Sequence, residues 1–365
     1  MESGDVDLST VLENELRNEE PYALLKKTLD EQESSEGRRW TLFLDIDGTV
    51  YKEGINNSAL YEQIKEGHWG LTYVTATDIK RMVALIQEGK IARPLAAGTN
   101  LGTRRFYLKE KSFEKSSDQI TEADFEEDRN YLAKVEASGF NKTKLFNDLT
   151  STLFQRINAD PKFSKFKFML LPPGDTTDPA TYAYEWIPRD PYKFDLYVTV
   201  AKDANAQEIQ EYQTYIKGFF TDYDILMYQD QTLENGDTKW NFHILPKNAW
   251  GKDNFVRDLA SEINTKGLIA GDSGNDIVQL LADYPGEAKD FIRAAVGGAK
   301  SDLIEKISDH SINQDARRGS MRRLNIERTE GVRMYQEKNQ ERVASQSLVY
   351  LMKVLERAWR MYGKK

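Results

Sequence analysis

Two apolar segments far apart in the chain end in the same unusual way, and this pairing restricts the fold more than any other feature. WTLFLDIDGT (40–49) and GLIAGDSGND (267–276) each begin as a buried β-strand and pass directly into aspartates and a glycine turn. For either stretch alone, a surface Asp-Gly turn with solvated carboxylates is a competing interpretation. Together they favour one site built from two strand ends.

The segments around these strands alternate between strand and helix. A helical pattern in SALYEQIKEG (58–67) precedes the strand GLTYVTAT (70–77), and Asp78 then opens a second helix. The same rhythm returns after residue 244. Repeated strand and helix units predict an α/β fold, a Rossmann-like core with a parallel sheet and crossover helices.

The middle of the chain breaks this rhythm, because long polar helical runs are followed by strands, one helix and two more strands. We therefore predict that one domain interrupts another. The predicted parts are an acidic N-terminal extension (1–37), the first part of the core (38–104), an inserted α+β domain (105–244), and the second part of the core with an arginine-rich segment and a C-terminal helix (245–365).

Composition narrows the function classes. The net charge of -9 and the pI near 5.2 argue against a general affinity for nucleic acid or for anionic membrane surfaces. The chain has no cysteine, so thiolate metal sites and disulfides are excluded. No apolar stretch is long enough to span a membrane, and we expect a cytoplasmic protein.

The C-terminal region contains arginines between 317 and 333 that alternate with acids, and this pattern is typical of a solvated surface. The last helix carries Leu348, Leu351, Leu355 and Trp359 at helical spacing. We expect these four side chains to pack on the core.

In an open parallel sheet, ligands bind outside the carboxyl ends of the strands, so Asp45, Asp47, Asp272 and Asp276 are expected to converge there. Such crowding of like charges is costly without a cation. Oxygen ligands and a strand-end crevice suit Mg²⁺. Zinc is disfavoured because the three histidines are scattered, and His243 is interpreted as an ordinary strand residue.

A phosphate substrate also needs a hydroxyl and a cation to hold its phosphoryl oxygens. Thr75 ends the second predicted strand, and Lys252 begins the helix before the strand that carries Asp272. Thr77 and Lys247 are the rival candidates for these two roles. Alignment with the strand end and the helix start favours Thr75 and Lys252.

These four elements resemble the motifs of the haloacid dehalogenase-like (HAD) phosphatases: DIDGT, the threonine after LTYV, the lysine of WGKDN, and GDSGND. The resemblance covers about residues 40–307. An α+β insertion between the second and third motifs is similar to the type IIB cap. Within that group, YKFDLYV and KWNFHILPKNAWGKDNFVRDL look most like the sucrose-phosphate phosphatases.

The resemblance implies a role for each matching residue. Asp45 is the implied nucleophile and Asp47 the general acid and base, with Thr75 and Lys252 on the phosphoryl group. The implied Mg²⁺ ligands are Asp45, Asp272 and the backbone carbonyl of Asp47, and Asp276 orients the metal shell or Lys252.

One departure from the family pattern concerns the second motif, where Ala76 and Thr77 follow Thr75 in place of glycine and arginine. An arginine contact near the substrate is then missing or comes from elsewhere.

The cap is expected to select the leaving group, because it closes over the crevice and excludes water. Its segment EWIPRDPYKFD carries Glu185, Trp186, Arg189 and Lys193, which are able to stack on or hydrogen bond a sugar. A surface strand position is an equally good interpretation of each. Asn275, in the GDSGND turn, is a further candidate substrate contact.

Three functional hypotheses follow. The leading one is a Mg²⁺-dependent phosphatase that hydrolyses a sugar phosphate, such as sucrose 6-phosphate or a related glycoside phosphate, through an aspartyl-phosphate. The second is a phosphomutase on the same scaffold, and the third a non-catalytic binding or regulatory protein. The acidic N-terminal extension and the arginine-rich segment also raise the hypothesis of a glycosyltransferase partner.

Overall fold

The structure is a computed structural model of the full chain. It describes residues 23–36, 39–54, 56–169, 192–247, 251–276, 279–280, 291–296, 299, 303, 326–329, 332–336, 346, 348–353 and 355–356.

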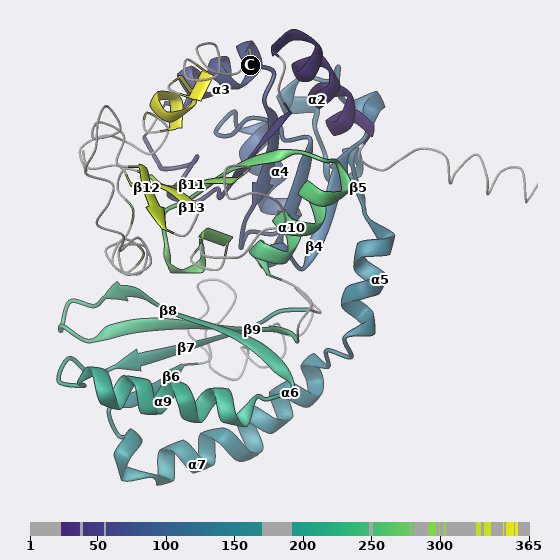
Figure 1. The fold of residues 1–365 in the computed structure, drawn as a ribbon. Coiled ribbons are helices and arrows are strands. Elements are labelled where there is room, and N and C mark those ends of the chain that lie inside the picture. Colours follow the sequence, from purple (N-terminus) through teal and green to yellow (C-terminus); the bar gives the residue numbers. More distant parts are fainter. Residues whose placement is uncertain are drawn as a thin grey trace, which may run out of the picture.

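A large, mostly parallel sheet forms the centre of the described fold (Figure 1). Its nine strands lie in the order β12-β13-β11-β10-β1-β2-β3-β4-β5, with β4, β5 and β12 antiparallel to their neighbours. The strands are β1 (Trp40–Leu44), β2 (Gly70–Val74), β3 (Ala96–Thr99), β4 (Arg104–Leu108), β5 (Phe125–Glu127), β10 (Lys266–Gly271), β11 (Phe291–Ala295), β12 (Ile326–Thr329) and β13 (Val332–Gln336).

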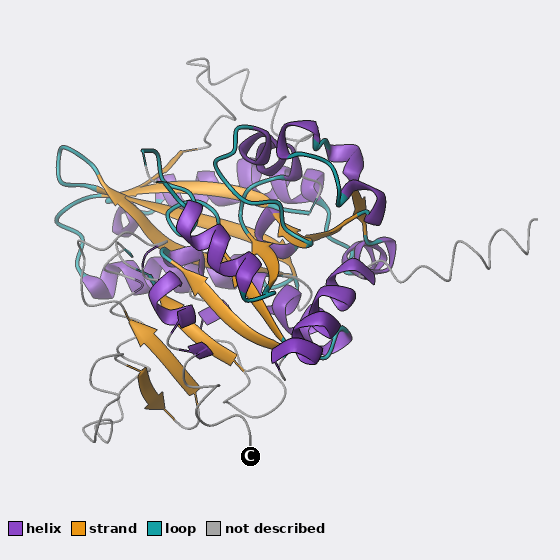
Figure 2. Cartoon of the chain, turned by 90° about the horizontal axis from the view of Figure 1, so that it is seen from above, coloured by secondary structure: helices purple, strands orange, loops and turns teal. Residues whose placement is uncertain are grey.

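The central strands are buried along their whole length because both faces of the sheet are covered. Every residue of β1 and β2 is buried, as expected for parallel strands between helix layers. Figure 2 shows helices on either side of the sheet. The helices associated with it are α2 (Ala23–Glu36), α3 (Ser58–Glu66), α4 (Ile79–Gln87) and α10 (Lys252–Glu262).

A second, antiparallel sheet has the order β6-β7-β9-β8. Its strands and helices are α5 (Arg129–Ala137), α6 (Lys142–Asp148), α7 (Phe154–Ala159), β6 (Phe166–Met169), β7 (Phe194–Val200), α9 (Ala206–Phe219), β8 (Tyr223–Thr232) and β9 (Thr238–Pro246). We call this segment, 129–246, the cap.

The cap has its own hydrophobic core, because alternate residues of its strands face its helices. Phe194, Leu196 and Val198 of β7 pack with Tyr212 and Ile216 of α9. In Figure 1, α7 and α9 cover the face of this sheet that is turned away from the large sheet. The opposite face of the cap sheet is therefore turned toward the large sheet. The predicted fold class, a parallel α/β core with an inserted α+β cap, is confirmed.

Strand pairing bears on the expected start of the inserted domain at residue 105. Strands β4 and β5 hydrogen bond within the large sheet, so this sheet continues to residue 127. These strands are short and partly polar, which made them resemble the insertion in sequence. We propose that the insertion begins at α5.

Part of the predicted N-terminal extension, helix α2, packs on the large core. Leu25 and Leu29 of α2 are fully buried in the large core, and Gln32 is buried beside them. The three residues lie on one helix face at i, i+4 and i+7. The Gln32 side chain also accepts a hydrogen bond from the Trp40 backbone N–H at the start of β1.

At the C-terminal end, Leu348, Leu351 and Leu355 are buried in the large core as expected, whereas Trp359 lies outside the described residues. Glu356 on the same segment accepts hydrogen bonds from Gln63 Nε2 and Trp69 Nε1, each at 2.9 Å. Within the described part of the chain, no helix combines the length and the apolar character needed to cross a bilayer.

Candidate active site

The site lies where three parallel strands end side by side. Strand β1 pairs in parallel with β10 on one side and β2 on the other, so Asp45, Asp272 and Thr75 emerge at the same edge. Backbone hydrogen bonds from Asp45 N to Ala270 O (3.1 Å) and from Thr75 N to Gly98 O (2.8 Å) continue the ladder to these residues. The positions predicted from strand ends are thus brought together.

The turn after Asp45 requires glycine for two reasons. Gly48 has φ +83°, a left-handed conformation that glycine adopts without strain. A Cβ atom at this position would lie 2.2 Å from an Asp272 carboxylate oxygen. Beside it, the Thr49 hydroxyl donates to Asp272 Oδ1 at 3.3 Å. The DIDGT turn therefore packs directly on the second acidic turn.

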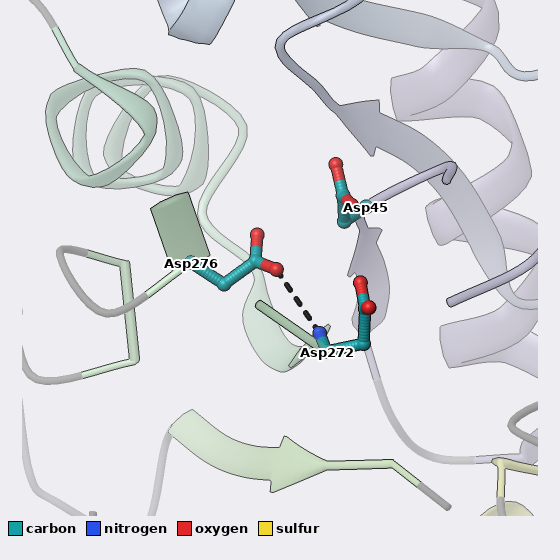
Figure 3. Close-up of side chains that lie close together, drawn as sticks. All are labelled: Asp45, Asp272 and Asp276. Atoms are coloured by element: carbon teal, nitrogen blue, oxygen red, sulfur yellow. Dashed lines mark hydrogen bonds between the residues drawn. The ribbon is translucent and has the colours of Figure 1, made fainter. Parts of the chain in front are cut away.

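Three buried carboxylates form a compact cluster: Asp45, Asp272 and Asp276 (Figure 3). One oxygen of each lies within 4.8 Å of the others. Burial raises the pKa of Asp45 well above its usual value, and the negative charges of Asp276 and Asp272 raise it further, against the opposing effect of Lys252. The cluster is an anionic centre with a deficit of positive charge.

Lys252 is the cation of this cluster. Its fully buried Nζ donates to Asp45 Oδ1 at 2.8 Å, to Asp276 Oδ1 at 2.6 Å and to Asn275 Oδ1 at 2.9 Å. Burial alone lowers the pKa of Lys252, but the charges of Asp276 and Asp45 outweigh it, so the net pKa is raised. Lys252 therefore remains charged, even though a cation in the first turn of α10 is unfavourable for the helix dipole.

When all three carboxyl groups are ionised, the single ammonium group leaves two uncompensated negative charges. The available donors are all oxygens, which suits a hard divalent cation such as Mg²⁺ better than zinc. Asp45 and Asp272 remain the predicted carboxylate ligands of this cation. The residues present thus fit the expected cofactor in both charge and ligand type.

Asp276 is held differently from the other two carboxylates. Its Oδ2 accepts from the backbone N–H groups of Asp272 (3.0 Å) and Ser273 (3.2 Å), and its Oδ1 accepts from Lys252 and Gln279. Both oxygens are engaged, so this arrangement favours the predicted role of orienting Lys252 over direct metal binding.

The Asp47 carboxylate is more exposed than the three carboxylates of the cluster, with half of its side chain accessible to solvent. Thr77 Oγ1 donates to its Oδ2 at 3.0 Å, and Arg81 Nη2 to its Oδ1 at 3.3 Å. Access to solvent and fixed orientation suit a group that exchanges protons. The expected metal contact of Asp47 involves its backbone carbonyl and stays a prediction.

Local geometry separates the rival candidates. Thr75 is buried at the end of β2, and its Oγ1 accepts the N–H of Thr77 at 3.1 Å, which leaves its hydroxyl hydrogen to donate. The Thr77 hydroxyl instead donates to the Asp47 carboxylate. Lys247 is exposed and donates to the carbonyl of Thr221 in the cap, so Lys252 is the lysine at the site.

The expected cap contacts are only partly described. Glu185, Trp186 and Arg189 lie outside the described residues. Lys193 lies at the start of β7 and pairs with Asp195 at 3.0 Å, with 13% of its side chain exposed. Asn275 lies in the site itself.

Sequence reasoning missed a polar network on the face of the cap sheet that is turned toward the large sheet. Tyr228 of β8 and Asn241 and His243 of β9 are buried and linked by hydrogen bonds. Only the alternation of polar and apolar residues in these strands signalled it. As expected, His243 is satisfied: its Nε2 lies 2.9 Å from Tyr228 Oη and its Nδ1 2.5 Å from Asp195 Oδ1.

A cavity of about 290 Å³ adjoins the site between the cap and α10. It is lined by Leu226 and Leu245 of the cap, by Leu101, and by Gly251 and Lys252 at the start of α10. The cap therefore covers the approach to Lys252 while leaving space beside it.

Comparisons with known proteins give a structural likeness and no sequence match. No protein-family profile and no curated protein sequence matches this chain. Among solved structures, the sucrose-phosphatase from Synechocystis sp., determined in complex with sucrose and phosphate, is similar with a TM-score of 0.52 and 14% identity over 87% of this chain and 98% of that one.

Two other solved structures are similar to this chain with lower TM-scores. A HAD subclass IIB sugar phosphatase gives a TM-score of 0.35 at 13% identity over 73% of this chain and 90% of that one. A haloacid dehalogenase-like hydrolase from B. subtilis gives 0.39 at 14% identity over 86% and 99%.

The chain shares the fold of this sucrose-phosphatase, and the parallel core with an inserted cap agrees with the fold that the sequence motifs predicted.

Proposed function

We propose that this protein is a Mg²⁺-dependent phosphatase that hydrolyses a sugar phosphate through an aspartyl-phosphate. The observation that carries the proposal is the buried contact of Lys252 with Asp45 inside a carboxylate cluster that is two positive charges short of neutrality. Such a site suits a divalent cation and a phosphoryl group together. The likeness to a sucrose-phosphatase supports the same class of chemistry.

In the first half-reaction, a carboxylate oxygen of Asp45 attacks phosphorus and the bond from phosphorus to the sugar oxygen breaks. Asp47 donates its proton to the departing oxygen, so the sugar leaves as an alcohol. Lys252 and the Thr75 hydroxyl stabilise the charge on the phosphoryl oxygens.

In the second half-reaction, Asp47 removes a proton from water and the resulting hydroxide attacks phosphorus. The bond between phosphorus and Asp45 breaks, inorganic phosphate is released, and both carboxyl groups return to their starting state. Thr77 and Arg81 keep Asp47 oriented for both proton transfers. When bound, Mg²⁺ would neutralise charge between Asp45, Asp272 and the substrate.

Support for a sugar as the leaving group comes from the cap. Asn241 Oδ1 is buried and has no hydrogen-bond partner among the described residues. A buried acceptor without a partner is costly. It lies on the face turned toward the large sheet, where a hydroxyl of the leaving group would satisfy it.

The test is phosphate release with Mg²⁺ from sucrose 6-phosphate, mannosyl- and glucosylglycerate phosphates and hexose phosphates. Wild type should turn over at least one compound, Asp45→Asn should not, and Asp118→Asn, a change at an exposed carboxylate far along the chain, should match wild type. Turnover that depends on an added sugar bisphosphate would favour the phosphomutase. A folded, Mg²⁺-binding protein without turnover would favour the non-catalytic alternative.

A further inference from the structure

Tyr228 links the polar face of the cap to the active site. Tyr228 lies on β8, directly opposite Asn241 on β9, and only 4% of it is exposed. It packs on the acidic turn of the core so closely that a Cβ atom on Gly274 would lie 2.4 Å from the Tyr228 Cβ atom. The next residue of that turn is Asn275, which accepts a hydrogen bond from Lys252.

The hydrogen-bonding capacity of each group fixes the direction of the bonds. Because a charged Lys252 can only donate, Asn275 uses its carbonyl oxygen toward Lys252 and keeps its NH₂ group free to donate. Burial raises the pKa of the Tyr228 hydroxyl, whereas side-chain hydrogen bonds from Asn241 and Asn275 lower it. Asn241 Nδ2 donates to the Tyr228 oxygen at 3.1 Å, and Asn275 adjoins Gly274, the residue on which Tyr228 packs.

The other end of the network is equally constrained. Lys193 and His243 hold the pKa of Asp195 below its usual range despite the opposing effect of burial, so Asp195 is a carboxylate and can only accept. His243 therefore donates from Nδ1 to Asp195. Its other ring nitrogen, Nε2, lies within hydrogen-bond distance of Tyr228 Oη, at 2.9 Å.

Hydrogen bonds thus join Lys252 to Asn275 in the core, and Asn241, Tyr228, His243 and Asp195 to one another in the cap. The two sets meet where Tyr228 packs on the turn that carries Asn275, and the second set ends at the partly buried carboxylate of Asp195. The contact between this turn and Tyr228 crosses from the core to the cap. It exists only while the cap sheet lies against the acidic turn.

We propose that Tyr228 is a positioning residue that couples closure of the cap to the orientation of Lys252, in the phosphatase defined by the proposed function. When Tyr228 accepts from the Asn275 NH₂ group, the Asn275 carbonyl is held toward Lys252. Without this contact, the Asn275 side chain is free to rotate, and Lys252 loses one of its three acceptors. The site then reaches full activity only when the cap is closed over a substrate.

The first test compares Tyr228→Phe with Tyr197→Phe. Tyr197 lies on the same face of the cap sheet, opposite Asn241 from the other side, and its ring packs against Lys239. Losing one hydrogen bond that holds a catalytic group should lower kcat about tenfold in Tyr228→Phe. We expect KM to change less than twofold and Tyr197→Phe to behave as wild type.

A double-mutant cycle separates positioning from a general structural effect. Because Tyr228 acts through Asn275, adding Tyr228→Phe to Asn275→Ala should cause no further loss of kcat. Losses that multiply, or a Tyr228→Phe effect confined to KM, would overturn the proposal.

A readout without substrate keeps this test independent of the proposed function. Amide hydrogen exchange of 272–276 should be faster in Tyr228→Phe than in wild type, although the change lies in the cap, and unaltered in Tyr197→Phe. If wild type hydrolyses no phosphate ester, the proposed function fails and hydrogen exchange alone decides on Tyr228. Unchanged exchange in Tyr228→Phe would then refute the coupling.

Discussion

Removing one charge from the carboxylate cluster should stabilise the metal-free protein while it destroys the response to metal. The change is Asp272→Asn. It removes a buried negative charge without changing the size of the side chain and keeps an oxygen to accept from Thr49. The three acceptors of the Lys252 ammonium group are Asp45, Asp276 and Asn275, and all three are unchanged in this variant.

The magnitude follows from the geometry of the cluster. Two unit charges 4.8 Å apart repel by about 3 kcal/mol at an effective dielectric constant of about 20. Part of this repulsion is already relieved in wild type, because the raised pKa of Asp45 lets it take up a proton. We expect Asp272→Asn to raise the free energy of unfolding by about 1–2 kcal/mol at neutral pH without metal.

The pH dependence has a definite sign. Asp45 has a raised pKa in the folded state, so the folded protein binds more protons than the unfolded chain above the usual carboxyl range. Stability of the metal-free protein therefore falls as pH rises from the unfolded pKa of Asp45 through its raised folded pKa. Asp272→Asn should make this fall shallower, because one source of the raised pKa is gone.

The assay is urea unfolding in EDTA and in Mg²⁺. Mg²⁺ at about 100 times its Kd should raise the free energy of unfolding of wild type by about 2.7 kcal/mol and that of Asp272→Asn by much less. Asp118→Asn serves as the control, because its carboxylate is exposed. A metal-free Asp272→Asn protein that is less stable than wild type, or that gains as much from Mg²⁺, would refute the electrostatic reasoning.

Three further changes test other parts of the site. Gly48→Ala should lower the free energy of unfolding in urea by more than about 2 kcal/mol and abolish the Mg²⁺ response, because its Cβ would meet Asp272. The control is Gly54→Ala, which has φ +77° and open space around the new Cβ and should lower it by about 1 kcal/mol. Thr77→Val should lower kcat about tenfold without affecting Mg²⁺ binding, since it frees Asp47; equal losses of kcat and metal affinity would contradict this assignment. Arg105→Leu should destabilise the protein by about 2–4 kcal/mol in urea, because it leaves Glu262 without its 2.6 Å partner, and a neutral effect would show that the ion pair contributes little.

Strand-end positions were predictable from the sequence because a parallel sheet aligns its carboxyl edges. Asp45, Thr75 and Asp272 follow apolar runs that leave little freedom in register. Lys252 was predictable because it opens the helix that precedes β10. The same rule could not find Arg81, which reaches Asp47 from a helix on the far side of a turn.

The cap network was not predictable, because alternation defines two strand faces but not the one that meets the core. Asn241 and His243 alternate with apolar neighbours in the expected way, yet the contact of Tyr228 with the acidic turn depends on how two separate sheets come together. The packing of helix α2 on the core was missed for another reason: its three buried residues are embedded in an acidic, weakly amphipathic sequence.

The two ends of the cap lie next to each other, and this has an evolutionary consequence. Tyr131 at the exit packs edge to face on Phe255 just after the return, with ring centroids 6.3 Å apart, and its hydroxyl donates to Gly102 O. An insertion between adjacent points closes a loop at little entropic cost and leaves the order of the core strands unchanged. Recombination at these two points would exchange residues 129–246 in one event and leave in place the strand ends that carry Asp45, Thr75 and Asp272.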